Sequence, residues 1–247
     1  DGADGETGMG LKFDLGAQPD ANVGCDGGGG GGGGGAPDFS YIWIANSGEG
    51  TISKINTETL VEEGRYYTRP DLQGSPSRTS VSLTGNVAVA NRSGGLTKFY
   101  ANTDDCSGGN TSTGAGDIQP WGDEDCMAWH TPMAYISQRP VAWTQGTFNE
   151  DTCQYENIAL WTAGRVGQQT DVLLLDGEDG AVIDMVTLAG FPNDYYGIYG
   201  GAVDGEGNFW GTMLGGILLT RVDKLTFDHQ VWQIGRASCR ERVSSPV

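Results

Sequence analysis

From residue 39 onward, short apolar or alternating runs follow one another, separated by Gly, Asn and Asp. Runs of this kind, bounded by turn-forming residues, predict β-strands. One pattern recurs: a strand, a glycine-containing turn, a second strand, and then a basic residue before an apolar one. It covers residues 43–56, 88–99 and 210–223, and a looser copy with a longer turn covers 160–176. Because no window shows helical periodicity, the pattern predicts an all-β chain.

The repeats follow a period. Counted from Ile55, the equivalent apolar positions are Phe99, Leu175 and Val222, at steps of 44, 76 and 47 residues. A period of about 40–50 residues with four short strands is typical of β-propeller blades. The long middle step contains one blade and an insertion, about residues 101–123, between the third and fourth strands of the second blade. The predicted inner strands are 79–83, 140–143 and 198–203, and the predicted outer strands are 60–66, 181–188 and 227–232.

The two ends of the chain differ from this pattern. Residues 1–38 are rich in Gly and Asp and include nine consecutive glycines, which predicts a disordered leader and tether. Residues 234–243, Ile-Gly-Arg-Ala-Ser-Cys-Arg-Glu-Arg-Val, resemble the translation of a common sequencing adapter, so residues 234–247 are expected to be a non-native tail. The propeller is therefore expected over residues 39–233, as a partial ring of about four four-stranded blades.

A family resemblance rests on one blade. Residues 197–210, Gly-Ile-Tyr-Gly-Gly-Ala-Val-Asp-Gly-Glu-Gly-Asn-Phe-Trp, followed by Arg-Val-Asp-Lys-Leu-Thr at 221–226, resemble the blade motif of virginiamycin B lyase-like propellers. The related YVTN and NHL repeats are similar. The resemblance covers about residues 39–233 and implies a bacterial exported propeller. In the lyases of this family, a His and Glu pair on late blades works with a divalent metal. In this sequence His130 and His229 fall in no matching motif, so the pair is not carried over.

The charge balance limits the possible partners. The chain carries 14 Lys and Arg against 32 Asp and Glu, for a net charge of −18. Nucleic-acid binding needs a basic footprint, so we expect no nucleic-acid partner. No apolar run approaches the roughly 20 residues of a membrane span, so we expect no transmembrane segment. The excess of acids is typical of a soluble surface.

The cysteines predict a disulfide. Cys106 and Cys126 flank the insertion, and both ends of the insertion belong to one hairpin, which can bring the two residues within disulfide distance. A bridge to Cys153 and unpaired buried thiols are the alternatives. The cysteines have no CxxC spacing or histidine partner that would indicate zinc. Use of a disulfide is typical of an exported protein, so we expect an extracellular, cell-surface or periplasmic location.

Motifs of catalysis and cofactor binding are absent from the sequence. There is no GxSxG, HExxH or P-loop, and we assign no catalytic residue. Calcium or magnesium is the candidate ion, because residues 104–112, 176–180 and 204–208 are acidic enough to supply oxygen ligands. Residues 104–112, however, lack oxygen ligands at regular alternate positions. Hairpin turns, in which Asp, Asn and Gly are common, explain the other two stretches more simply, so we assign no metal ligand.

A candidate binding site lies at the predicted channel. Arg78 and Arg139 each open a predicted inner strand, and Gly200 takes the equivalent place in the fourth blade, beside Tyr199. Inner strands meet at the mouth of a propeller channel, where two guanidinium groups would attract an anionic ligand. Ordinary pairing with the abundant acids is the alternative.

Together these features predict an exported, non-catalytic β-propeller that binds a small anionic ligand or a protein or surface partner, or serves as a scaffold. The alternative is a lyase-like, metal-assisted enzyme whose catalytic blades are missing from this sequence. A structural surface protein without a small ligand is the third possibility.

Overall fold

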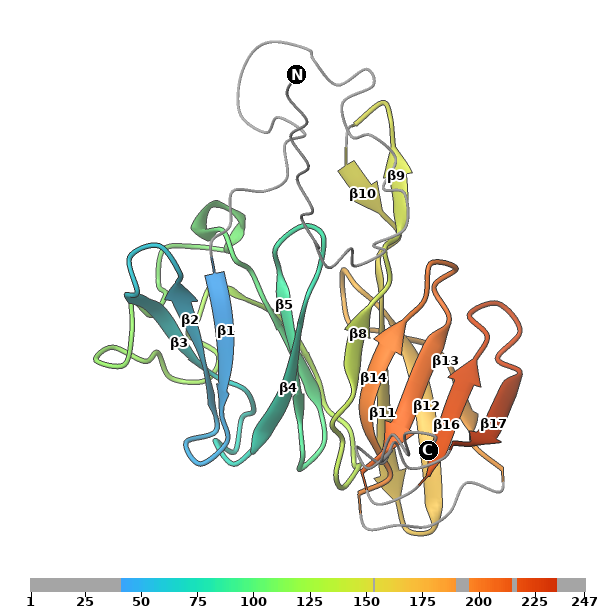
Figure 1. The fold of residues 1–247 in the computed structure, drawn as a ribbon. Helices are drawn as coiled ribbons and strands as arrows, with labels where there is room; N and C mark the ends of the chain where they lie inside the picture. The colour runs from blue at the N-terminus through green and yellow to red at the C-terminus, as the bar shows by residue number, and fades with distance from the viewer. Residues whose placement is uncertain (1–40, 153, 190–195, 215–216, 235–247) are drawn as a thin grey trace, which may run out of the picture.

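The computed structural model describes residues 41–152, 154–189, 196–214 and 217–234. Within them the chain forms five antiparallel sheets, and the four larger ones stand side by side as successive blades (Figure 1). The predicted all-β class and the partial ring of propeller blades are confirmed. The predicted leader, 1–38, lies outside the described residues, as does the predicted tail apart from Ile234.

The first two blades are built from consecutive strands, each hydrogen-bonded to the next. The first sheet comprises β1 (Tyr41–Asn46), β2 (Thr51–Asn56) and β3 (Glu62–Tyr67). The second comprises β4 (Pro76–Val81), β5 (Val87–Asn91), β6 (Leu96–Phe99) and β7 (Met127–Thr131). The insertion separates β6 from β7 and contains a 3-10 turn, Thr103–Asp105. In the part of the chain that the structure describes, no helix has the length and apolarity that crossing a membrane requires.

The third and fourth blades have four strands each. The third comprises β8 (Val141–Trp143), β11 (Ala159–Val166), β12 (Gln169–Asp176) and β13 (Val182–Thr187). The fourth comprises β14 (Ile198–Val203), β15 (Phe209–Met213), β16 (Leu218–Val222) and β17 (His229–Gln233). A separate hairpin of β9 (Thr147–Asn149) and β10 (Gln154–Glu156) interrupts the third blade between β8 and β11.

Three local expectations need correction. The third blade has no long turn, because β11 and β12 are eight residues each and are joined by a two-residue turn at Gly167, whose φ of 57° suits a tight hairpin. The inner strand of the second blade begins at Pro76 rather than at residue 79, because proline is tolerated at the first residue of a strand. The hairpin of β9 and β10 was not predicted, since its strands are three residues each and show no clear alternation.

The hydrophobic core lies between blades rather than within one sheet. Tyr66 of the first blade stacks on Phe99 of the second, with ring centroids 5.0 Å apart. Between the third and fourth blades, Trp161 lies 5.7 Å from Phe209. A third cluster, which includes Leu160, joins the second blade to the third. Each sheet is therefore held by its neighbours, as in other repeat architectures.

The predicted equivalence of four apolar positions is confirmed. Ile55, Phe99, Leu175 and Val222 lie near the ends of β2, β6, β12 and β16, the strands that precede the outer strand of each blade. The last three are fully buried against the preceding blade. Ile55 is half-buried, because the structure describes no blade before the first.

Two buried lysines link successive blades. Lys54 on β2 donates from Nζ to the carbonyl of Ala101, 2.6 Å away, and Lys98 on β6 donates to the carbonyl of Gly177, 2.8 Å away. Ala101 and Gly177 each lie two residues after the equivalent apolar position of the next blade, Phe99 and Leu175 respectively. Burial lowers the pKa of both ammonium groups. The hydrogen bonds offset part of the cost of burying the charge, which explains the basic position of the repeat.

Candidate functional site

The predicted site residues come from three consecutive blades. Arg78 lies on β4, Arg139 lies two residues before β8, and Tyr199 lies on β14. These inner strands neighbour one another, β4 beside β8 and β8 beside β14 (Figure 1). The guanidinium carbons of Arg78 and Arg139 each lie 4.8 Å from the centroid of the Tyr199 ring. Two arginines from neighbouring blades thus contact the same tyrosine ring near the starts of the inner strands.

The register explains how these side chains meet, and it corrects one detail. A β-bulge lies between Pro76 and Arg78 on β4, and another lies at Tyr199 on β14. Through the paired strands, Arg78 is equivalent to Gly200, as predicted, but Arg139 is equivalent to Tyr199 rather than to Gly200. The two arginines therefore occupy neighbouring register positions of their blades, not the same position. A β-bulge changes the direction of the side chains beside it, which allows both arginines to reach the tyrosine ring.

Two further residues extend the cluster. The Arg139 guanidinium also lies 5.2 Å from the ring centroid of Tyr196, and the two tyrosine rings meet edge to face at 5.8 Å. Arg92, in the turn after β5, donates to Ser47 Oγ at 2.8 Å and to Ser75 Oγ at 3.1 Å. The blade register could have identified Arg92, because the end of the second strand lies beside the start of the inner strand. Tyr196 could have been found from its closeness to Tyr199 in the sequence.

The surroundings of Arg139 favour an anion. The side chain is 7% exposed, and it donates to the hydroxyl oxygens of Ser137 at 3.1 Å and Ser77 at 3.4 Å. Its pKa is lowered, first by burial and then by the positive charges of Arg92 and Arg78. A guanidinium stays protonated at neutral pH despite such effects. A buried cation with neutral partners is costly, and an anion between the arginines would remove that cost.

Other arginines of the described chain pair with acidic side chains, and the arginines of this cluster do not. Arg65 pairs with Glu49 at 2.8 Å, and Arg221 pairs with Asp223 at 3.3 Å. Within the described ranges, no Asp or Glu lies at ion-pair distance from Arg78, Arg92 or Arg139. Ordinary pairing with acids, the alternative interpretation of the sequence, is therefore not what this part of the structure shows.

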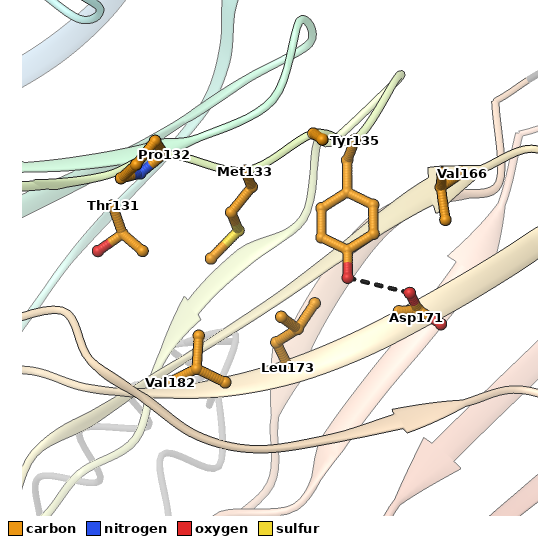
Figure 2. Close-up of a pocket in the computed structure, with 9 residues that line it drawn as sticks. Thr131, Pro132, Met133, Tyr135, Val166, Asp171, Leu173 and Val182 are labelled. Atoms are coloured by element: carbon orange, nitrogen blue, oxygen red, sulfur yellow. Dashed lines mark hydrogen bonds between the residues drawn. The ribbon is translucent and has the colours of Figure 1, made fainter.

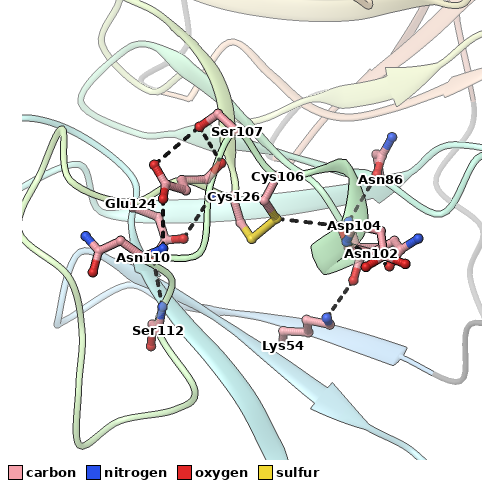
Figure 3. Close-up of a disulfide and its surroundings, with 12 residues drawn as sticks. Lys54, Asn86, Asn102, Asp104, Cys106, Ser107, Asn110, Ser112, Glu124 and Cys126 are labelled. Atoms are coloured by element: carbon pink, nitrogen blue, oxygen red, sulfur yellow. Dashed lines mark hydrogen bonds between the residues drawn. A yellow bond between two sulfur atoms is a disulfide. The ribbon is translucent and has the colours of Figure 1, made fainter.

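The insertion is closed by the predicted disulfide. Cys106 and Cys126 are bonded, with Cα atoms 4.4 Å apart (Figure 3). Cys153, the alternative partner, lies outside the described residues. Glu124 is buried and accepts hydrogen bonds from the backbone N–H groups of Ser112 at 3.0 Å and Cys126 at 2.9 Å. Ser112 in turn accepts from the backbone of Arg65 on β3, so the insertion is fixed to the first blade.

The acidic stretches at residues 176–180 and 204–208, which were candidates for ion binding, are turns between strands. Asp176 accepts from the backbone of Glu178 at 2.7 Å, in the turn between β12 and β13. Asp204 accepts from the backbone of Glu206 at 3.0 Å and from the indole of Trp210 at 2.8 Å, and these bonds lower its pKa against the opposing effect of burial. No group of three or more His, Cys, Asp or Glu among the described residues has the arrangement of a metal site.

The two histidines lie in different blades. His130 is on β7 of the second blade, and His229 begins β17 of the fourth. The lyase alternative requires a His and Glu pair on late blades, and it stays a prediction from the family resemblance.

Comparison with known proteins supports the fold. No family model matches the chain, and no curated protein has a significantly similar sequence. The fold is similar to that of a streptogramin B lyase, with 14% identity and a TM-score of 0.52 over 83% of this chain and 55% of that chain. It is also similar to virginiamycin B lyase from Staphylococcus aureus, with 12% identity and a TM-score of 0.50 over 83% of this chain and 59% of that chain.

The WD40 repeats of RRP9 are similar at 13% identity and a TM-score of 0.51, over 80% of this chain and 48% of that chain. At such identities the likeness shows the propeller fold alone. The chain spans about half the length of these three proteins.

Proposed function

We propose that this chain is an exported, non-catalytic β-propeller module that binds an anionic ligand at one mouth of its channel. The supporting observation is the cluster of Arg78, Arg92 and Arg139, which has no acidic partner among the described residues. Arg78 and Arg139 of this cluster contact the Tyr199 ring. The ligand is a small carboxylate or phosphate, or an acidic group on a partner protein or surface.

The chemistry of the cluster supports this class of ligand. Guanidinium groups present planar pairs of N–H donors that fit the two oxygens of a carboxylate or phosphate. The Tyr199 ring lies 4.8 Å from the guanidinium carbon of both Arg78 and Arg139 and stabilises both cations. The net charge of −18 repels anions from the rest of the surface, so binding would be confined to this cluster.

Export is supported by the disulfide. Disulfides persist in oxidising compartments, and the Cys106–Cys126 bridge is compatible with an extracellular, cell-surface or periplasmic location. Fractionation of the source cells, followed by detection of the chain, would test this part of the proposal. Recovery in the cytoplasm with both thiols reduced would contradict it.

The binding proposal is tested by calorimetric titration with inorganic phosphate and with citrate. Arg78→Ala and Arg139→Ala should each weaken binding at least about tenfold, a factor that corresponds to about 1.4 kcal/mol. Arg221→Ala is the matched control, because it removes a cation that already pairs with Asp223 in the fourth blade. If neither anion binds the wild-type chain, or if the control weakens binding as much as the two variants, the proposal is wrong.

A further inference from the structure

A cavity of about 340 Å³ opens between the second and third blades, separate from the channel mouth. Its walls come from the segment after β7 and from β11, β12 and β13 (Figure 2). None of its lining residues belongs to the cluster of Arg78, Arg92, Arg139 and Tyr199. The volume lies at the lower end of the range for small-molecule sites, which is roughly 300–1,000 Å³.

Most of the cavity wall is apolar. Met133 and Leu173 face the space, and Val166 and Val182 border it (Figure 2). Leu173 is buried, whereas Val166 and Val182 are exposed, which indicates that the cavity opens to solvent on their side. Such a wall favours a compact hydrocarbon group, since burial of apolar surface is the main favourable contribution.

One carboxylate interrupts this wall. Asp171 on β12 is 6% exposed, and its Oδ2 accepts a hydrogen bond from the Tyr135 hydroxyl at 3.0 Å (Figure 2). Its Oδ1 accepts from the Thr187 hydroxyl at 2.6 Å. In the described part of the chain, no Lys, Arg or His lies at ion-pair distance from Asp171. A buried carboxylate that accepts hydrogen bonds from two neutral donors can still bind a cation, because each of its oxygens can accept a second hydrogen bond.

The packing of Tyr135 fixes this geometry. Its ring lies against the backbone of Gly164 on β11, where an added Cβ would come within 2.3 Å of the ring. Burial raises the pKa of the Tyr135 hydroxyl, and the hydrogen bond to Asp171 raises it further. The hydroxyl therefore stays a neutral donor and does not neutralise the carboxylate.

We propose that this cavity binds a small primary ammonium ion with a compact apolar group. The ammonium donates to the carboxylate of Asp171, and the hydrocarbon part packs against Met133 and Leu173. A neutral molecule would leave the carboxylate without a counter-charge, and an anion would be repelled by it. The strongly acidic surface also raises the local concentration of cations. The proposal is independent of anion binding at the channel mouth.

The test compares two probes of nearly the same shape, 2-phenylethylammonium and neutral 2-phenylethanol. Calorimetry on the full chain should show that the ammonium binds at least about tenfold more tightly than the alcohol. Asp171→Asn keeps the shape of the side chain and should abolish this preference. Asp184→Asn, an exposed position on β13, removes the same charge outside the cavity and should preserve it.

A second variant tests the cavity independently, in case Asp171→Asn fails to fold. Val182 is 45% exposed at the border of the cavity, so Val182→Phe fills space without repacking the core. The larger side chain should occupy the space in which the phenyl group of each probe packs. Binding of both probes should therefore weaken at least about fivefold. Equal binding of the ammonium and the alcohol by the wild-type chain would overturn the proposal. Unchanged ammonium binding by Val182→Phe would also overturn it.

Discussion

Acid should destabilise this fold through one histidine. His130 on β7 is partly buried, with Nδ1 2.9 Å from Thr97 Oγ1 and its ring edge to face with Trp121 at 5.1 Å. Burial, with a smaller contribution from the charge of Arg69, lowers the pKa of His130 from 6.5 to about 4. Between these values the unfolded chain binds a proton that the folded chain does not bind. Stability is therefore present above pH 6.5 and is lost as the pH falls towards 4.

The size of this effect follows from the same difference in pKa. At about 1.36 kcal/mol for each pH unit, the interval between 6.5 and about 4 corresponds to roughly 3.4 kcal/mol. The imidazole is only partly buried, so solvent screening reduces this value, and we expect about 1.5–2 kcal/mol. His130→Gln removes the titrating group and should remove this part of the acid sensitivity.

Urea unfolding of the wild-type chain and of His130→Gln at pH 7, 6, 5 and 4 measures the difference directly. The wild-type unfolding free energy should fall about 1.5–2 kcal/mol further than that of the variant over this range. His229→Gln, which removes the other histidine, is the matched control variant. Because the carboxylates titrate equally in all three proteins, they cancel in the comparison. Parallel curves for the wild type and His130→Gln would refute the reasoning.

Three further predictions concern stability. Serine at both Cys106 and Cys126 should lower the unfolding free energy by about 3 kcal/mol, and a reducing agent should then have no effect on urea unfolding. Lys98→Ala should cost about 2–4 kcal/mol because it leaves a cavity, whereas Lys98→Met should change the unfolding free energy by less than about 1.5 kcal/mol. Gly164→Ala should lower the melting temperature by several degrees, because the new Cβ displaces the ring of Tyr135; an unchanged melting temperature would contradict that packing.

The repeat pattern predicted most of the blade architecture. The spacing of Ile55, Phe99, Leu175 and Val222 located the third strand of each blade, because each position packs against the same part of the preceding sheet. The turn residues likewise located the hairpins of the first, second and fourth blades, whereas the turn of the third blade is shorter than predicted. The strands of the hairpin at 147–156 were not predicted, since pairs of three-residue strands contain too few alternating positions for a pattern to be visible.

The candidate site was predicted in part. The convergence of Arg78, Arg139 and Tyr199 followed from the inner-strand assignment, since inner strands of neighbouring blades lie side by side. Arg92 joins the cluster from a turn, and Tyr196 joins it from the connection that leads into β14. Neither belongs to an inner strand, so the strand pattern alone did not select them.

The sequence by itself indicated most of the strands, the period of the blades and the favoured disulfide across the insertion, with Cys153 and unpaired thiols as alternatives. These features depend on residues close in the chain or on a repeated pattern, so local chemistry is enough to identify them. Only the tertiary structure decided which charges are buried and which are paired. Lys98 looks like a surface residue in the sequence, yet it is buried because the next blade brings the carbonyl of Gly177 to its ammonium group. Asp171 and Tyr135 likewise meet only because the segment between β7 and β8 packs against the third blade, which depends on contacts between distant parts of the chain.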